Sequence, residues 1–108
     1  MSAQVAADLR AAADVLERDG WTQGSYTDDN GCYCAAGAVL KAMRYDLSEG
    51  GDYMRAVEAF EAVLRQVLRA GSSAPEGAVI AWNDAAGRTA AEVIAALRAA
   101  ADRAEAEL

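Results

Sequence analysis

The chain contains no histidine, a single proline and two cysteines among its 108 residues. Without histidine it lacks the usual general base and the commonest nitrogen ligand of transition metals. Cys32 and Cys34 are the only thiol ligands, whereas a structural zinc site takes four cysteine or histidine ligands. We therefore expect no metal and no other cofactor, and the composition weighs against an enzyme.

Positive charge is also scarce, with ten basic residues against 17 acidic ones and a net charge of −7. Proteins that follow a nucleic-acid backbone usually carry a basic patch, so we expect no direct nucleic-acid binding. No stretch approaches the roughly 20 apolar residues of a membrane span, and the charged N-terminal segment does not look like a signal peptide. The expected location is the cytoplasm, without a membrane partner and with both thiols reduced.

Large aliphatic side chains are few, because Leu, Ile, Val and Phe together supply 19 residues while alanine supplies 28. Alanine has the highest helix propensity, and the apolar residues recur at helical spacing. A chain of this length is too short to divide into two domains with separate cores. We expect one all-α domain over residues 1–108, a compact bundle of four main helices and one short helix. Trp21 and Trp82 are expected to close its two ends.

Apolar spacing and capping residues predict helices over about residues 2–19, 32–44, 52–69, 75–84 and 90–108, the second and third being central. Residues 78–82 also have strand character, but a helix is favoured. Gly37 within the second helix indicates a close crossing by another backbone segment. Local partners are expected too: Asp14 with Arg18 as an i,i+4 pair, and two capping boxes, Ser73 with Glu76 and Thr89 with Glu92.

Four segments form the most specific pattern: Gly20-Trp21-Thr22-Gln23-Gly24, Tyr33-Cys34-Ala35-Ala36-Gly37-Ala38, Trp82-Asn83-Asp84 and Arg88-Thr89. In this order and spacing the chain resembles an uncharacterised family of small proteins from actinobacteria and their phages. The resemblance covers nearly the whole chain, and the Trp-Asn-Asp element with Arg-Thr is its most specific part. It implies a bacterial or phage origin and carries no activity.

Cys34 is the candidate reactive thiol, because a helix N-terminus lowers the pKa of a thiol. With no histidine to act as its base, a small buried structural cysteine is the favoured interpretation. The Asp28–Asn30 segment faintly resembles a calcium loop. The twelfth position of such a loop would be Gly37, where a bidentate glutamate is required. We therefore favour a solvated turn.

Trp82, Asn83, Asp84 and Arg88 are the candidate binding residues, since an exposed tryptophan beside arginine is typical of binding hot spots. A structural explanation gives each a local role: Trp82 fills the core, Asn83 or Asp84 ends the fourth helix, and Arg88 pairs with Asp84. The structural explanation is favoured, and the two are compatible.

Three functional hypotheses remain open. The leading one is a non-enzymatic interaction module that binds a protein partner, or weakly itself, through an acidic or alanine-lined face such as Ala91, Ala95, Ala99 and Ala106. The second is a small-ligand binder or enzyme that uses Cys34 and the Asp28–Asn30 loop, which requires one pocket holding both. The third is an acidic nucleic-acid mimic, which requires clustered acidic side chains.

Overall fold

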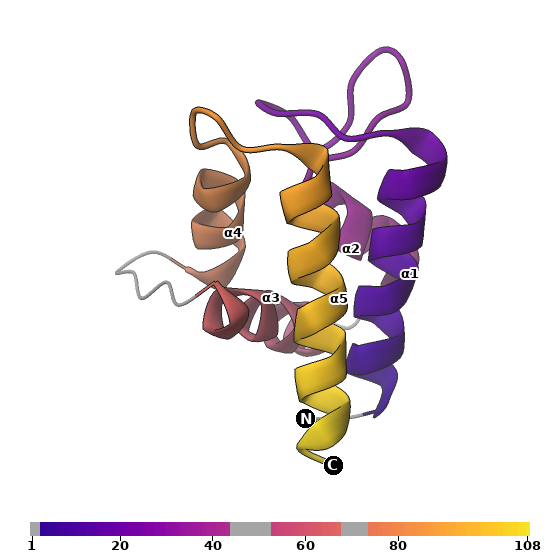
Figure 1. The fold of residues 1–108 in the computed structure, drawn as a ribbon, viewed down its shortest axis with the longest axis vertical. Helices are drawn as coiled ribbons and strands as arrows, with labels where there is room; N and C mark the ends of the chain where they lie inside the picture. Colours follow the sequence, from indigo (N-terminus) through magenta and orange to yellow (C-terminus); the bar gives the residue numbers. More distant parts are fainter. Residues whose placement is uncertain (1–2, 44–52, 68–73) are drawn as a thin grey trace.

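The computed structural model describes residues 3–43, 53–67 and 74–108. Within these residues the chain forms five α-helices and no strand, as Figure 1 shows, which confirms the all-α prediction. The helices are α1 (Ala3–Asp19), α2 (Ala35–Met43), α3 (Tyr53–Gln66), α4 (Pro75–Asn83) and α5 (Ala90–Ala106). Residues 78–82, the segment with strand character, lie inside α4. No helix of the described segments is long and apolar enough to cross a membrane.

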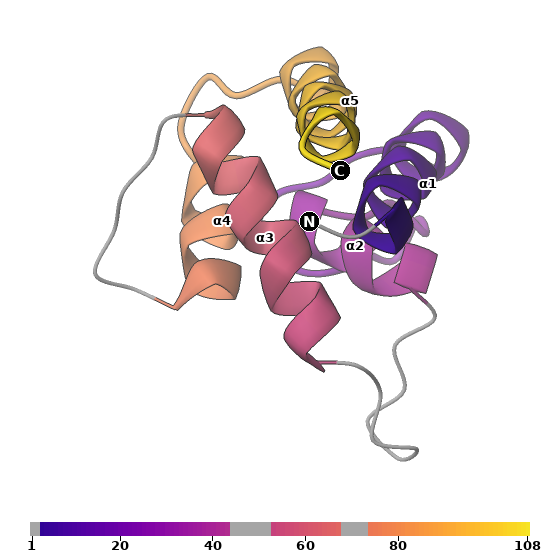
Figure 2. The same cartoon turned by 90° about the horizontal axis from the view of Figure 1, so that it is seen from below.

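Helices α1 and α5 run antiparallel along one side of the molecule (Figure 1). Both helices bury several alanines, whose small side chains leave room for other helices to pack closely: Ala12 and Ala13 on α1, Ala100, Ala101 and Ala104 on α5. Helix α3 contacts all four other helices. Figure 2 shows α3 crossing the molecule between α4 on one side and α1 and α2 on the other. The largest fully buried apolar side chains are Phe60, Leu9, Leu97, Val5, Val39, Val63, Val79 and Val93.

Arginines on α1 and α5 tie these two helices together at the surface. Arg98 of α5 binds Glu17 at 2.6 Å and Asp14 at 3.5 Å. Arg18 instead binds its neighbour Asp19 at 2.9 Å. The expected Asp14–Arg18 pair is therefore wrong, because Asp14 faces α5 rather than the next turn of its own helix.

A buried ion pair joins α1 to α3. Asp8 is buried, and its carboxylate accepts hydrogen bonds from Arg55 Nε at 2.8 Å and from Gln4 Nε2 at 3.0 Å. The sequence contains a signal for it, since Asp8 lies on the apolar stripe of α1 beside Leu9. A carboxylate at such a position requires a charged partner, because an unpaired buried charge is strongly destabilising.

The two expected capping boxes have different outcomes. Thr89 caps α5, accepting a hydrogen bond from the backbone of Glu92, whose side chain accepts one from the Thr89 backbone, so this box is confirmed. The N-cap of α4 is Ala74, which makes no side-chain cap, and Glu76 accepts a hydrogen bond from the Tyr26 hydroxyl instead. The predicted box of Ser73 with Glu76 depends on Ser73. Ser73, like the expected ends of the third helix at 52 and 69, lies outside the described residues.

Candidate functional site

The four sequence segments that carry the family resemblance meet at one end of the molecule, where the loop of residues 20–34 lies against the C-terminal end of α4 (Figure 1). Asn83, which is fully buried, is the centre of this contact. Its Oδ1 accepts from Trp21 Nε1 at 2.6 Å and from the Ala35 backbone N–H at 2.9 Å. Its Nδ2 donates to the Thr22 carbonyl at 3.1 Å and to Asp84 Oδ1 at 3.0 Å. All four hydrogen-bonding positions of the amide are used.

Asn83 thereby caps a helix that is remote in sequence. Ala35 opens α2, and the first backbone N–H groups of a helix have no partner inside it. The loop in turn donates hydrogen bonds to the C-terminal end of α4. Gln23 Nε2 donates to the carbonyls of Asn83 and Ala85 at 3.0 and 3.1 Å. The Gly24 N–H donates to Asp84 Oδ1 at 3.0 Å. The loop, α2 and the end of α4 therefore form one hydrogen-bonded unit.

Arg88 belongs to this unit through Trp82, not through Asp84. Its Nε donates to the Trp82 carbonyl at 3.0 Å, its guanidinium lies 4.6 Å from the centroid of the Trp82 ring, and its Nη1 is 3.2 Å from Glu92 Oε2. The expected Asp84–Arg88 pair is wrong because the chain turns after α4, with Gly87 at a φ of 81°, so Asp84 faces the loop.

Trp82 is 5% exposed, which confirms its expected place in the core and leaves no exposed tryptophan for a recognition patch. Trp21 is hydrogen-bonded to Asn83, the residue next to Trp82. The two tryptophans therefore close the same end of the bundle, and the expectation that they close opposite ends is wrong. Of the four candidate binding residues, Asp84 is exposed and Arg88 is partly exposed.

The Asp28–Asn30 segment is a self-contained turn. Asp28 Oδ1 accepts from the backbone N–H groups of Cys32 at 2.9 Å and Asn30 at 3.0 Å. These hydrogen bonds, that of Cys32 first, lower the pKa of Asp28. The segment therefore forms the predicted turn. Across residues 3–43, 53–67 and 74–108, no three acidic or cysteine side chains are grouped to hold a metal ion.

Cys34 lines a small cavity of about 180 Å³, together with Gly24, Ser25, Tyr26, Ile80 and Asp84. The side chain is 2% exposed, and burial raises the pKa of its thiol, against a smaller lowering by the N–H of Gly37, which donates to Sγ at 3.3 Å. Burial, with Asp28 nearby, also raises the pKa of the Cys32 thiol. Both cysteines are free. The residues that line this cavity do not include the Asp28–Asn30 turn, which the alternative hypothesis of a ligand binder or enzyme places in one pocket with Cys34.

Gly37 marks a close approach of the loop to α2. A Cβ placed on Gly37 would lie 2.2 Å from the carbonyl oxygen of Tyr26. That same carbonyl accepts the backbone N–H of Cys34 at 3.1 Å. The close backbone crossing that the sequence indicated is confirmed, and it fixes Tyr26 above the side of α2.

A second, larger hollow of about 780 Å³ lies where α1, α2 and the loop meet. We call it the α1–α2 groove. Its lining residues are Ala11, Asp14, Val15 and Arg18 of α1, Tyr26, Thr27 and Tyr33 of the loop, and Gly37, Leu40, Lys41 and Ala42 of α2. The floor contains buried Val15 and half-buried Leu40 and Tyr33, while the rim is polar and exposed.

This groove was not among the sites predicted from the sequence. Lys41, the only lysine, lies on an otherwise apolar helix, and this was the available signal. Nothing local in the sequence shows that Tyr26 and Tyr33 would lie beside it, because the course of the loop is set by Asn83 about 50 to 60 residues away.

The sequence profile of a family of unknown function, DUF6197, matches residues 1–103 of the chain. This agrees with the resemblance to an uncharacterised family. No curated protein and no solved structure matches the chain.

Proposed function

We propose that this chain, which belongs to the family of unknown function DUF6197, is a non-enzymatic protein-interaction module. Because membership of this family assigns no activity, the proposal is based on the geometry of the α1–α2 groove. In this function the groove binds a segment of a protein partner.

The observation that carries the proposal is the shape and lining of the groove. An apolar floor with a polar rim is the usual anatomy of a protein interface, and tyrosine and arginine are enriched there. Tyr26 is 44% exposed at the edge of the groove, and Arg18 is exposed on the opposite wall. A site for a small molecule buries most of its ligand, whereas the exposed rim of this groove suits a longer chain segment that passes along it.

The chemistry of the cysteines supports a non-enzymatic role. The Cys34 thiol is buried with a raised pKa, so it is protonated at neutral pH and a poor nucleophile. The chain has no histidine that would serve as its base. A cytoplasmic location is proposed because both cysteines are free, and an actinobacterial or phage origin because of the motif resemblance.

A small-ligand site at the Cys34 cavity is the second candidate. Its volume of about 180 Å³ is below the roughly 300–1,000 Å³ of typical ligand pockets and close to a cavity that holds benzene. A nucleic-acid mimic ranks third. Arg10 and Arg98 each bind two carboxylates along α1 and α5, so these acids do not form an uncompensated negative surface.

Site-specific photo-cross-linking in the organism that encodes the protein tests the proposal. The cross-linking amino acid replaces Thr27 at the rim of the groove or, as the control, exposed Ala95 of α5 on the alanine-lined face. We expect a discrete cross-linked protein from the Thr27 position that is lost when Leu40→Gln alters the floor, with the melting temperature of that variant checked. Cross-links from the Ala95 position alone, or from neither position, would contradict the proposal.

A further inference from the structure

Within the described residues, several arginines of this acidic protein form ion pairs with carboxylates of the same chain. Among the arginines, Arg10 and Arg98 join α1 to α5, Arg55 binds buried Asp8, and Arg103 lies near Glu107. Each guanidinium therefore meets a carboxylate of the same chain, and little of it is left to attract an external anion.

The rim of the α1–α2 groove differs, because Lys41 of α2 and Arg18 of α1 both line it. Lys41 makes no ion pair with any residue that the structure describes. Arg18, which is exposed, is bound at 2.9 Å to Asp19, its neighbour in the sequence, which is partly exposed. An exposed pair of this kind contributes little to stability and is readily exchanged, so both cations remain accessible to an incoming carboxylate.

The remaining charge of the groove fixes where that carboxylate would lie. Asp14, the one acidic residue among the lining residues that the structure describes, sits one turn before Arg18 on α1 and is approached by Arg98 from α5 at 3.5 Å. An anion is therefore repelled at the Asp14 end and attracted at the end with Arg18 and Lys41. The pKa of Asp19 is lowered by the hydrogen bond from Arg18 first and then by the charge of Lys41, so both cations act on this end of α1.

The floor adjoining these cations is apolar. Val15 of α1 and Leu40 of α2 both line the groove. Tyr33 supplies an aromatic wall from the loop. An occupant of matching chemistry has a large apolar side chain for the floor and a carboxylate beside it for the rim.

From this pattern, and resting on the proposed function, we infer that the α1–α2 groove recognises an acidic peptide segment of a protein partner. The segment inserts an apolar or aromatic side chain between Val15 and Leu40 and places an adjacent Asp or Glu against Lys41 and Arg18. Such a partner must overcome the net charge of −7, so recognition depends on these two local cations.

A library of short random peptides, displayed and selected on the intact chain, tests the inference. We expect the selected peptides to contain Asp or Glu next to Leu, Ile, Phe or Trp. In nuclear magnetic resonance spectra they should shift the signals of Val15, Tyr33 and Leu40. Their affinity should fall roughly tenfold in Lys41→Glu, as reversal of a rim charge does.

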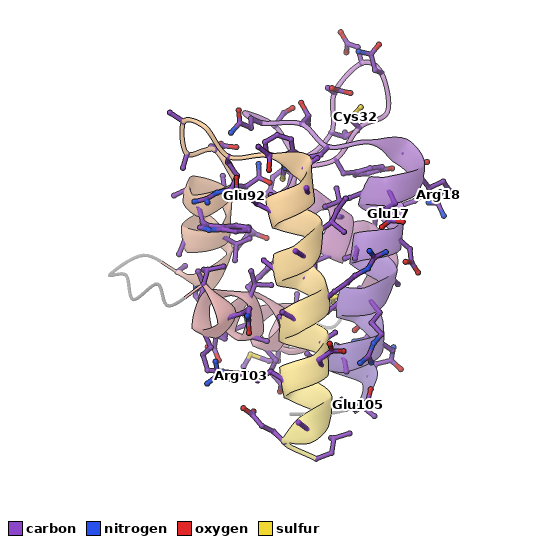
Figure 3. All side chains as sticks on the ribbon, in the orientation of Figure 1. Glu17, Arg18, Cys32, Glu92, Arg103 and Glu105 are labelled. Carbon is purple, nitrogen blue, oxygen red and sulfur yellow. The ribbon has the colours of Figure 1, made fainter. Side chains whose placement is uncertain are left out.

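Arg103→Glu is the matched control. Lys41 and Arg103 are each the basic residue in the last turn of their helix, so both reversals cost the same kind of helix-end interaction. Figure 3 shows Arg103 near the end of α5, far from the loop that carries Cys32. This variant should bind the selected peptides as the wild type does.

The outcomes separate the inference from the proposed function. Neutral or basic peptides that still shift the groove signals would overturn the acidic specificity and leave the interaction module standing. Selected peptides that shift other surfaces would overturn both. If decanoate bound more tightly than any selected peptide and this binding also fell in Lys41→Glu, the ligand of the groove would be an amphipathic carboxylate and not a peptide. Self-association lost in Lys41→Glu but kept in Arg103→Glu, seen by light scattering, would replace it by a second copy of this chain.

Discussion

Gly37→Ala is the substitution for which sequence and structure predict opposite changes in the stability of the domain. Gly37 lies inside α2, and alanine is favoured over glycine in a helix by about 1 kcal/mol. On propensity alone the substitution stabilises the domain. The Cβ it adds, however, would lie 2.2 Å from the carbonyl oxygen of Tyr26. Real Cβ atoms do not approach an oxygen so closely, so the loop must move by close to 1 Å.

The cost of this movement follows from what holds Tyr26 in place. Its carbonyl accepts the Cys34 N–H at 3.1 Å, and its hydroxyl donates to Glu76 at 2.9 Å. Overpacking of an interior costs about 1–3 kcal/mol, and a weakened buried hydrogen bond adds about 1 kcal/mol. Subtracting the gain in helix propensity leaves a destabilisation of about 1–3 kcal/mol, a lowering of the melting temperature by roughly 5–15 °C for a domain of this size.

Urea and thermal unfolding, followed by circular dichroism and tryptophan fluorescence, measure the effect. Gly77→Ala is the control, because Gly77 lies in α4 and is exposed. The same substitution should there stabilise the domain by about 0.5–1 kcal/mol. If Gly37→Ala melts at or above the wild-type temperature, the Tyr26 carbonyl does not lie over α2 and the described course of the loop is wrong.

Four further predictions concern the hydrogen-bonded unit and the loop. Arg88→Ala should destabilise the domain by about 2 kcal/mol and Thr89→Ala by about 1 kcal/mol in urea unfolding, since Arg88 is 21% exposed and bound to Trp82; the reverse order would contradict the described contacts. Asn83→Asp should cost about 3 kcal/mol or more at neutral pH, because it turns a donor into a carboxylate facing Asp84. The loss of unfolding free energy relative to wild type should shrink as the pH falls, because protonation of the introduced carboxylate restores one donor and favours the folded state. A loss independent of pH would count against the contact of residue 83 with Asp84. Cys34 should be alkylated more slowly than Cys32 and than a model thiol at neutral pH, and a faster reaction of Cys34 would reopen the nucleophile hypothesis. The pKa of Asp28 is lowered in the folded state, so Asp28 stabilises the domain at pH values above the ordinary carboxyl pKa of about 4 and loses this contribution as the pH falls through its folded pKa. In the Asp28→Asn variant the unfolding free energy should therefore fall less steeply at acidic pH. An unchanged acidic slope would refute the lowered pKa.

The helices were predictable because their signals are local. Apolar spacing located all five, and the Thr89 capping box spans only three residues. The same local reasoning failed for Arg88, because an i,i+4 spacing brings side chains together only within a continuous helix. Helix α4 ends at Asn83, so Asp84 and Arg88 lie on either side of a turn and find different partners.

The candidate site depends on contacts between residues far apart in sequence, which no spacing rule supplies. The motifs that carry the family resemblance are separate in the sequence, and the sequence does not show that they touch. In the structure Trp21 and Gln23 bind Asn83, and Arg88 binds Trp82. In this chain the pattern therefore describes how the loop is anchored to the bundle. The groove itself lies beside these motifs, and Lys41 is the part of it that composition alone sets apart.

The bonds of Asn83 also bear on how the domain opens. The backbone N–H groups of Ala35 and Gly24 depend on acceptors 48 and 60 residues later in the chain, so they lose protection from solvent exchange whenever the end of α4 detaches. Amide exchange should then report one opening free energy for the loop, the start of α2 and the end of α4, because such segments form a single cooperative unit. Tyr26, Thr27 and Tyr33 of the same loop line the groove. The groove therefore depends on the docking of α4, and a bound partner would slow the exchange of amides that it never touches.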